Sequence, residues 1–155
     1  MAAKPIPEGY RSVTPYLVVD NASEAIAFYT RAFGAKELYR MPMPDGKIAH
    51  AEFRVGDAIV MIADEAPDQG YRSPKSLGGS SVSLMFYVDD VDAVAKRAVA
   101  EGLEVLRPVQ DQFYGDRSGN FRDPFGHLWT IATHKEDLTP EEMNQRTKKM
   151  FGGGA

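Results

Sequence analysis

The stretch Tyr16-Leu-Val-Val-Asp20 decides the fold, because it returns 69 residues later as Met85-Phe-Tyr-Val-Asp89. Both copies are rich in β-branched and aromatic residues, which is typical of strands, and each leads into apolar residues at helical spacing. Two copies of so long a period do not make a solenoid, which needs three or more short units. We therefore expect one domain of two homologous halves, with a site between them that draws residues from equivalent positions in both.

Each half is expected to have the order strand, helix and three strands. In the first half the apolar stretch from Ala22 to Phe33 follows a capping residue, Asp20 or Asn21, and ends at Gly34. Residues 65–81 are rich in glycine, proline and serine, which predicts a linker. Near the C-terminus, Thr139-Pro-Glu-Glu142 predicts the beginning of a further helix. The expected boundaries within this single domain are 12–64 for module one, 65–81 for the linker, 82–134 for module two and about 140–150 for the C-terminal helix.

The composition restricts the class of protein. The 155 residues suffice for one domain with a core, and the net charge of −4 argues against a nucleic-acid-binding surface. The absence of cysteine excludes disulfides and thiolate chemistry. No segment approaches the roughly eighteen consecutive apolar residues that a membrane span needs. We expect a cytoplasmic protein with neither nucleic-acid nor membrane partners.

Three segments carry a family resemblance: VTPYLVVDNASEAIAFYTRAFGA, IAHAEFRVGDAIVMIADE and YGDRSGNFRDPFGHLWTIATH. They resemble the vicinal oxygen chelate superfamily, which includes glyoxalase I, bleomycin-resistance proteins, extradiol dioxygenases and fosfomycin-resistance enzymes, and within it the PhnB-like branch. The resemblance implies an α+β fold of two tandem β-α-β-β-β modules whose mixed sheets form a cup-shaped half-barrel, plus a C-terminal helix. It also implies a homodimer and a small-molecule ligand in the cup.

The resemblance further implies where a metal would bind. Metal-dependent members place one ligand on the first strand and one on the last strand of each module, which here correspond to Thr14, Met61, Ser83 and Thr130. Divalent transition ions need imidazole, carboxylate or thiolate ligands, and hydroxyls with a thioether do not replace them. We therefore expect no cofactor and no metal at these four positions, which are instead candidates for binding the ligand.

The hairpin around Gly56-Asp57 predicts which side chains line the cup. A two-residue loop pairs Val55 with Ala58, so Arg54 opposes Ile59 and Glu52 opposes Met61. Because Met61 holds a cup-facing position in the family, Arg54, Glu52 and His50 should face the cup too. The other face, with Ala49, Ala51, Phe53 and Val55, should pack under the helices. His50 and Glu52 are then either a catalytic acid–base pair or a structural hydrogen bond in a partly wet cavity.

Other residues complete the list of candidates. Tyr114 and Arg117 are expected either at the rim of the second half-cup or, through Asp116 and Arg117, in a structural salt-bridge network. Trp129 is expected in the core, and a metal site that joins His50 to another histidine is weakly supported. The ligand-binding candidates are Thr14, Arg54, Met61, Ser83, Met85, Tyr114, Arg117 and Thr130.

Two functions remain open at this point. The first is a binding protein that sequesters an apolar or aromatic small molecule without chemistry, which the missing metal ligands favour. The alternative is a lyase, isomerase or dioxygenase-type enzyme that uses His50 and Glu52, with or without an atypical metal.

Overall fold

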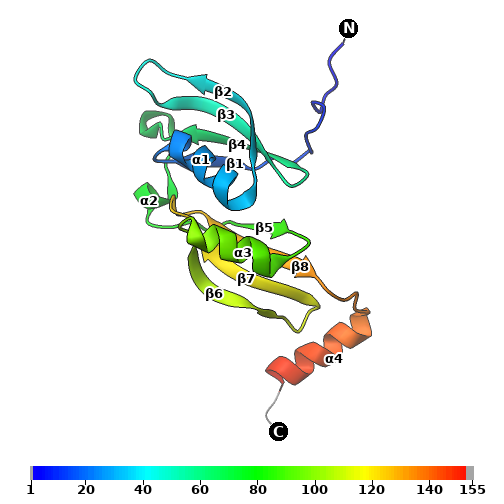
Figure 1. The fold of residues 1–155 in the computed structure, drawn as a ribbon. Coiled ribbons are helices and arrows are strands. Elements are labelled where there is room, and N and C mark those ends of the chain that lie inside the picture. The colour runs from blue at the N-terminus through cyan, green and yellow to red at the C-terminus, as the bar shows by residue number, and fades with distance from the viewer. Residues whose placement is uncertain (1, 153–155) are drawn as a thin grey trace.

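The computed structural model of the chain describes residues 2–152 and shows two similar halves, each with one mixed four-stranded sheet (Figure 1). The strand order is β1-β4-β3-β2 in the first sheet and β5-β8-β7-β6 in the second. The predicted fold class of two β-α-β-β-β modules and a C-terminal helix is therefore confirmed. The elements of the first half are β1 (Tyr16–Val19), α1 (Ala22–Phe33), β2 (Lys36–Pro42), β3 (Ile48–Val55) and β4 (Ala58–Asp64). Those of the second are β5 (Ser83–Tyr87), α3 (Val91–Ala100), β6 (Glu104–Asp111), β7 (Asp116–Arg122) and β8 (Leu128–His134).

Helix α1 begins and ends where the sequence predicts, and α3 begins with the same kind of cap. The side chain of Asn21 accepts a hydrogen bond from the backbone N–H of Glu24, and Asp90 caps α3 in the same way through Ala93. Gly34 ends α1 in the left-handed conformation that glycine adopts without strain. These local signals fix both helices, and their apolar sides then pack on one face of their own sheets.

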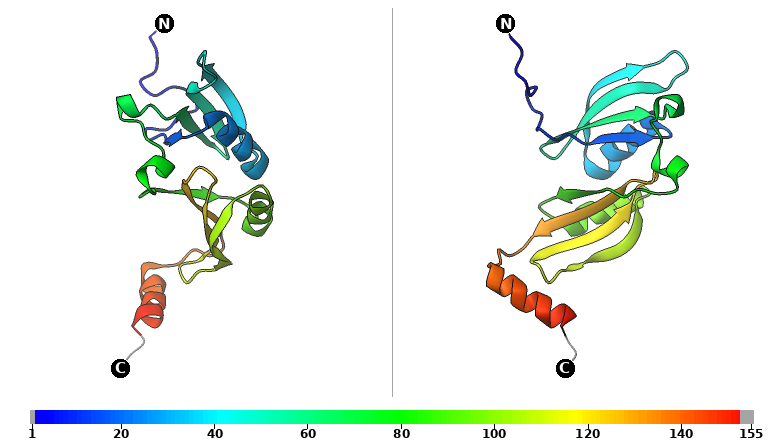
Figure 2. Two further views of the ribbon diagram at one scale, coloured as in Figure 1. Left: turned by 90° about the vertical axis from the view of Figure 1, so that its left-hand side faces the viewer. Right: turned by 180° about the vertical axis from the view of Figure 1, so that it is seen from behind.

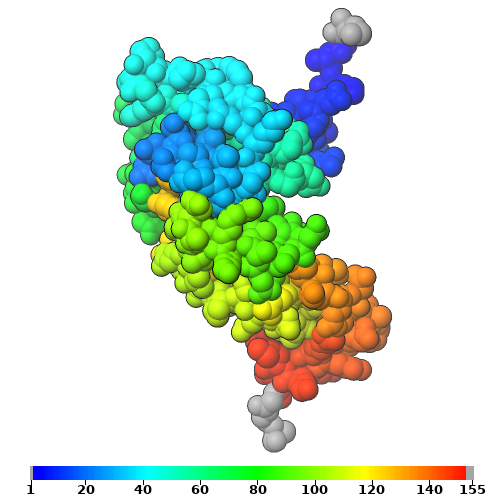
Figure 3. Space-filling view, viewed as in Figure 1, coloured from blue at the N-terminus to red at the C-terminus, as the bar shows by residue number. Residues whose placement is uncertain are grey.

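The two halves meet through their helices. Figure 2 shows α1 and α3 on the same side of the molecule, each covering its own sheet, and the guanidinium of Arg97 in α3 donates to the carbonyl oxygen of Ala32 in α1 at 3.1 Å. Figure 3 shows the halves following one another along an elongated molecule. The opposite faces of both sheets are left uncovered by α1 and α3.

A buried carboxylate ties the halves together. Asp123 is 2% exposed and accepts from the hydroxyl of Tyr29 in α1 at 2.5 Å and from the indole N–H of Trp129 at 2.9 Å. Its other oxygen accepts the backbone N–H groups of Phe125 and His127, both at 2.9 Å. Burial, followed by the charge of Asp123, raises the pKa of Tyr29 well above its ordinary value. Trp129 belongs to the core, as expected, and the carboxylate satisfies its N–H.

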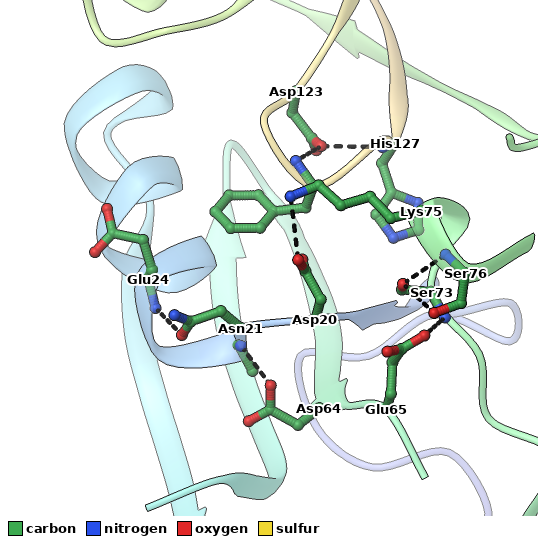
Figure 4. A network of polar contacts seen from close by, with 12 residues as sticks. Asp20, Asn21, Glu24, Asp64, Glu65, Ser73, Lys75, Ser76, Asp123 and His127 are labelled. Carbon is green, nitrogen blue, oxygen red and sulfur yellow. Dashed lines mark hydrogen bonds and ion pairs between the residues drawn. The ribbon is translucent and has the colours of Figure 1, made fainter. Parts of the chain in front are cut away.

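The segment predicted as a linker contains two short helices, η1 (Pro67–Gln69) and α2 (Pro74–Leu77). Figure 4 shows how it is fixed: Glu65 accepts the backbone N–H of Ser73 at 2.5 Å, and the side chain of Ser73 caps α2 at Ser76. Lys75 pairs with Asp20 at 3.1 Å, next to the edge strand β1. Ser73-Pro74 begins α2 just as Thr139-Pro140 begins the C-terminal helix. The four residues of α2 are too few for the sequence to show helical periodicity, so this helix was not predicted.

The prediction of which β3 side chains pack under the helices is wrong at one residue, Ala49. Ala51, Phe53 and Val55 are buried under the helices as expected, whereas Ala49 is exposed and Ile48 takes the inward position. The pairing with β2 slips there, because Met41 pairs with His50 while the next residue, Pro42, pairs with Ile48. This irregularity is a bulge, which reverses the inward and outward alternation locally.

The C-terminal helix α4 (Pro140–Phe151) stands at the end of the second half (Figure 1). Thr139 and Glu142 form the predicted capping box. Arg146 holds the helix by donating to the Phe113 carbonyl and by pairing with Glu136 at 2.7 Å, and no residue of the helix is buried. Within residues 2–152, no helix combines the length and the apolarity that crossing a membrane requires.

Candidate functional site

The open face of the first sheet carries a chain of hydrogen-bonded polar side chains. The hairpin register is the predicted one, with Val55 opposite Ala58 and Glu52 opposite Met61. Because β1 runs parallel to β4 and pairs Tyr16 with Met61, the side chains of Tyr16 and Glu52 flank Met61 on one face. His50, two residues before Glu52 on β3, shares this face.

The array has a defined order. The Tyr16 hydroxyl lies 2.8 Å from Nδ1 of His50, and Nε2 of His50 lies 3.0 Å from Oε1 of Glu52. The other carboxylate oxygen of Glu52 accepts the hydroxyl of Tyr10, which arrives from the segment before β1. The side chains of His50 and Glu52 are 24% and 20% exposed, so they are shielded by their neighbours and still accessible from solvent.

The protonation states follow from these contacts. The hydrogen bonds from Tyr10 and His50 lower the pKa of Glu52, so it is a carboxylate at neutral pH. Burial, followed by the hydrogen bond to Glu52, raises the pKa of Tyr10 to about 12. Burial raises the pKa of Tyr16, and electrostatic interaction with Tyr71 and Glu52 raises it further. Both tyrosines are therefore neutral phenols that can donate.

Aromatic rings border the array. The ring of Tyr16 lies 5.5 Å from that of His50 and 6.4 Å from that of Tyr71, and the ring of Tyr39 lies 6.5 Å from His50. Tyr16 also lines a hollow of about 260 Å³ toward α2 and His127. The face thus offers flat apolar surfaces beside one carboxylate and one imidazole, a combination that suits a small molecule with both apolar and polar groups.

On the equivalent face of the second sheet, the two positions that match His50 and Glu52 carry neutral side chains, and an ionisable pair, Asp116 and His134, lies further along it. In the first sheet Met61 pairs with Tyr16 and Glu52, and in the second sheet Thr130 pairs with Met85 and Asn120. Asn120 is therefore the counterpart of Glu52. Ser118, two residues before Asn120, is the counterpart of His50. Asn120 donates to the Thr130 hydroxyl at 2.7 Å, which also lies 3.4 Å from the hydroxyl of Ser83. The Tyr114 hydroxyl lies 3.3 Å from that of Ser118, so Tyr114 belongs to this face.

The positions aligned with family metal ligands do not suit a metal. Thr14 precedes β1 and donates to the carbonyl of Arg11 at 3.1 Å, and the residue of β1 that pairs with Met61 is Tyr16. The remaining donors, one thioether and the hydroxyls of Ser83 and Thr130, are poor ligands for divalent transition ions. Among residues 2–152 no three His, Cys, Asp or Glu side chains are grouped as a metal site requires.

Arg117 lies away from the open faces, whereas His134 lies on the open face of the second sheet. Arg117 pairs with Asp92 of α3 at 2.8 Å and with Asp111 at 3.2 Å, so it is held on the helix side of β7 and does not face the array. The alternative reading of Arg117, a structural salt bridge, describes its contacts better. His134 lies between two carboxylates, 2.7 Å from Asp116 and 2.9 Å from Asp137, far along the chain from His50. Asp116 therefore belongs to a different network from Arg117.

Two members of the array, Tyr16 and Tyr10, were not predicted from the sequence. Tyr16 holds the position equivalent to Met85, and its pairing with Met61 could have been deduced from the same register that placed Glu52. Tyr10 lies in a proline-rich segment with no periodicity, and no pattern in the sequence connects it to Glu52, 42 residues away.

Comparison with known proteins agrees with this architecture. The chain is 43% identical over 135 residues to the uncharacterized Mycobacterium tuberculosis protein Rv0887c, covering 85% of this chain and 79% of the relative. The crystal structure of TioX from Micromonospora matches with a TM-score of 0.64 and 29% identity, over 83% of this chain and all of TioX.

The fold is also shared with a structure that contains a metal ion. FosX, a fosfomycin resistance protein from Listeria monocytogenes crystallised with Mn(II) and sulfate, matches with a TM-score of 0.62 and 22% identity, over 88% of this chain and 97% of FosX. Likeness at this level of identity concerns the fold alone. The family model for Glyoxalase/Bleomycin resistance protein/Dioxygenase superfamily matches residues 11–131. The chain belongs to this superfamily.

Proposed function

We propose that the protein binds a small molecule against the open face of the first sheet, through the array of Tyr16, His50 and Glu52, and without the metal of its metal-dependent relatives. The observation that carries the proposal is the array itself: three interacting, partly exposed polar side chains on the sheet face that α1 leaves uncovered. The neighbouring tyrosine rings suit a ligand with a flat apolar part. Within the superfamily we assign the chain to the PhnB-like branch, on the three segments quoted above.

We further propose that a second copy of the chain completes the site, as a homodimer. The uncovered sheet faces expose large apolar side chains, including Tyr39, Met41, Met85 and Tyr87, each between 46% and 57% exposed. A protein that works as a monomer rarely leaves so many on one face. Light scattering at micromolar concentration should report twice the chain mass of 17.1 kDa, and a species of one chain mass would contradict the proposal.

The second candidate function is acid–base catalysis on the bound molecule. It is favoured by the position of His50 between a phenol and a carboxylate, because a histidine held in one tautomer by a carboxylate is a common general base. A lyase or isomerase reaction needs such a base, and it does not need the metal.

The experiment that tests binding compares two histidines. Compounds with a planar aromatic part and a polar group are screened against the wild-type protein by thermal shift, and the affinities of the hits are measured for His50→Ala. We expect the affinity to fall at least tenfold, about 1.4 kcal/mol, while the free energy of unfolding changes little. His134→Ala is the matched control, since it also removes an imidazole bonded to a carboxylate and lies in the other half. It should leave the affinity unchanged.

The structural alternative gives the opposite result. If the pair served only to stabilise the fold, His50→Ala would leave Glu52 with an unmade hydrogen bond. The free energy of unfolding would then fall by about 1–3 kcal/mol while the affinity stayed the same. That outcome would refute the proposed site.

A further inference from the structure

We propose that the hydroxyl of Tyr16 is an activated nucleophile that reacts with acyl and sulfonyl electrophiles, with His50 as its general base and Glu52 as the group that orients His50. Tyr16, which pairs with Met61, was not among the residues expected to form the site. The proposal concerns the same face as the proposed ligand site, but it does not need the ligand, so each can fail without the other.

The direction of each hydrogen bond in the array follows from the ionised state of Glu52. Glu52 is ionised and can only accept, so Nε2 of His50 must carry a hydrogen and donate to it at 3.0 Å. In the neutral imidazole, Nδ1 then has a free lone pair and no hydrogen. The contact of 2.8 Å between Nδ1 and the Tyr16 hydroxyl is therefore a bond that Tyr16 donates. The order phenol, imidazole, carboxylate is that of a nucleophile, its base and the orienting acid.

The orientation of the array is held from its far end. Tyr10 donates to the second oxygen of Glu52, so the carboxylate is fixed by one donor on each oxygen. Glu52 and His50 lie two residues apart on one strand, and strands place side chains more rigidly than loops do. The lone pair of Nδ1 thus stays directed at Tyr16.

The phenol requires this base. Burial raises the pKa of Tyr16, so its hydroxyl keeps the proton at neutral pH and is a weak nucleophile alone. The side chain is accessible, because Tyr16 is 43% exposed and borders the hollow of about 260 Å³. A small aryl or acyl compound that enters this hollow lies against Tyr16.

The reaction balances without a co-reactant. With an arylsulfonyl fluoride, the Tyr16 oxygen forms a bond to sulfur, the sulfur–fluorine bond breaks and fluoride leaves with the electron pair. The phenolic proton passes to Nδ1 of His50, and the product is an aryl sulfonate ester of Tyr16. With an acyl compound the oxygen attacks the carbonyl carbon, the leaving group departs with its electron pair, and His50 again takes the proton.

The chain supplies its own reference tyrosines. Tyr39 and Tyr71 are 49% and 48% exposed, and their rings lie 6.5 Å from that of His50 and 6.4 Å from that of Tyr16. Within residues 2–152 their hydroxyls have no hydrogen-bond partner. They share the same solution and the same reagent, and they differ from Tyr16 in lacking a base. The rates of labelling at the three residues can therefore be compared within one sample.

The test is labelling of the full-length protein with benzenesulfonyl fluoride at neutral pH, followed by peptide mass spectrometry at several times. We expect Tyr16 to be labelled about tenfold faster than Tyr39 and Tyr71, or more, since a positioned base contributes at least that much. The rate at Tyr16 should reach its plateau well below pH 10, where free phenols ionise. Equal rates at the three tyrosines in the wild-type protein would overturn the proposal without any variant.

The variant His50→Asn tests the base itself. Asparagine can accept the hydrogen bond of Tyr16 near the position of Nδ1, but it cannot take up a proton at neutral pH. Labelling of Tyr16 should fall to the level of Tyr39 and Tyr71, while their own rates stay unchanged, which also shows that the variant is folded. If Tyr16 remained the fastest site in His50→Asn, His50 would not be its base and the proposal would be wrong.

Discussion

Removing the carboxylate of Asp123 should destabilise the protein more than any surface change. The side chain accepts four hydrogen bonds, from Tyr29, Trp129, Phe125 and His127, and it is buried. The variant Asp123→Ala leaves four donors without an acceptor, and a buried unsatisfied donor costs about 1 kcal/mol or more, so the expected loss is about 4 kcal/mol. This is a large part of the stability of a domain, about 5–15 kcal/mol.

The variant Asp123→Asn distinguishes the contributions of the two carboxylate oxygens to stability. Its amide oxygen can keep the backbone N–H groups of Phe125 and His127, while its NH₂ group faces Tyr29 and Trp129. The Tyr29 hydroxyl can turn to accept, but the indole N–H is only a donor, so one donor is lost and we expect a cost of about 2 kcal/mol.

Urea unfolding measures both losses. The control is Asp57→Asn, in the exposed hairpin turn between β3 and β4, which should change the free energy of unfolding by less than about 0.5 kcal/mol. If Asp123→Ala unfolded within about 1 kcal/mol of the wild type with an unchanged denaturant slope, the carboxylate would not hold the two halves together.

Two further predictions concern metal and pH. Protein purified without added metal should contain no stoichiometric transition ion, because the positions aligned with family metal ligands offer only hydroxyls and a thioether. Chelators should leave its melting temperature unchanged. Elemental analysis that finds about one ion per chain would contradict this prediction. Hydrogen bonds from Ser76 and Ser73 lower the pKa of Glu65 to about 2 from the ordinary 4.5, so its stabilising effect is complete above about pH 4.5 and is lost as the pH falls through about 2. The unfolding free energies of wild type and Glu65→Gln should therefore differ more at pH 7 than at pH 2, and an equal difference at both would exclude the linkage.

The parts of the fold with local signals were predictable from the sequence. The two-residue turn at Gly56-Asp57 fixes the hairpin register, and the register places Glu52 beside Met61 on the open face. Asn21 and Gly34 mark the ends of α1 through hydrogen bonds within a few residues. Each of these features depends on neighbours in the chain, which the sequence displays directly.

What depends on distant contacts was not predictable. The bulge at Ala49 arises from the pairing with β2, and Ala49 itself carries no mark of it. Thr14 keeps the repeat spacing from Ser83, yet β1 begins only at Tyr16, so the aligned position lies outside the strand. The donation from Tyr10 to Glu52 joins an irregular segment to a strand, and only the folded chain shows it.

The neutral residues Ser118 and Asn120 on the open face of the second sheet have a consequence for the origin of the array. Both halves build the same four-stranded frame, and the frame accepts Ser118 and Asn120 at the places that His50 and Glu52 occupy in the first half. The architecture therefore imposes no demand for an imidazole and a carboxylate at these places. The second half carries no ionisable pair at these two places, and its sheet still forms. Selection on folding alone would not distinguish the two halves.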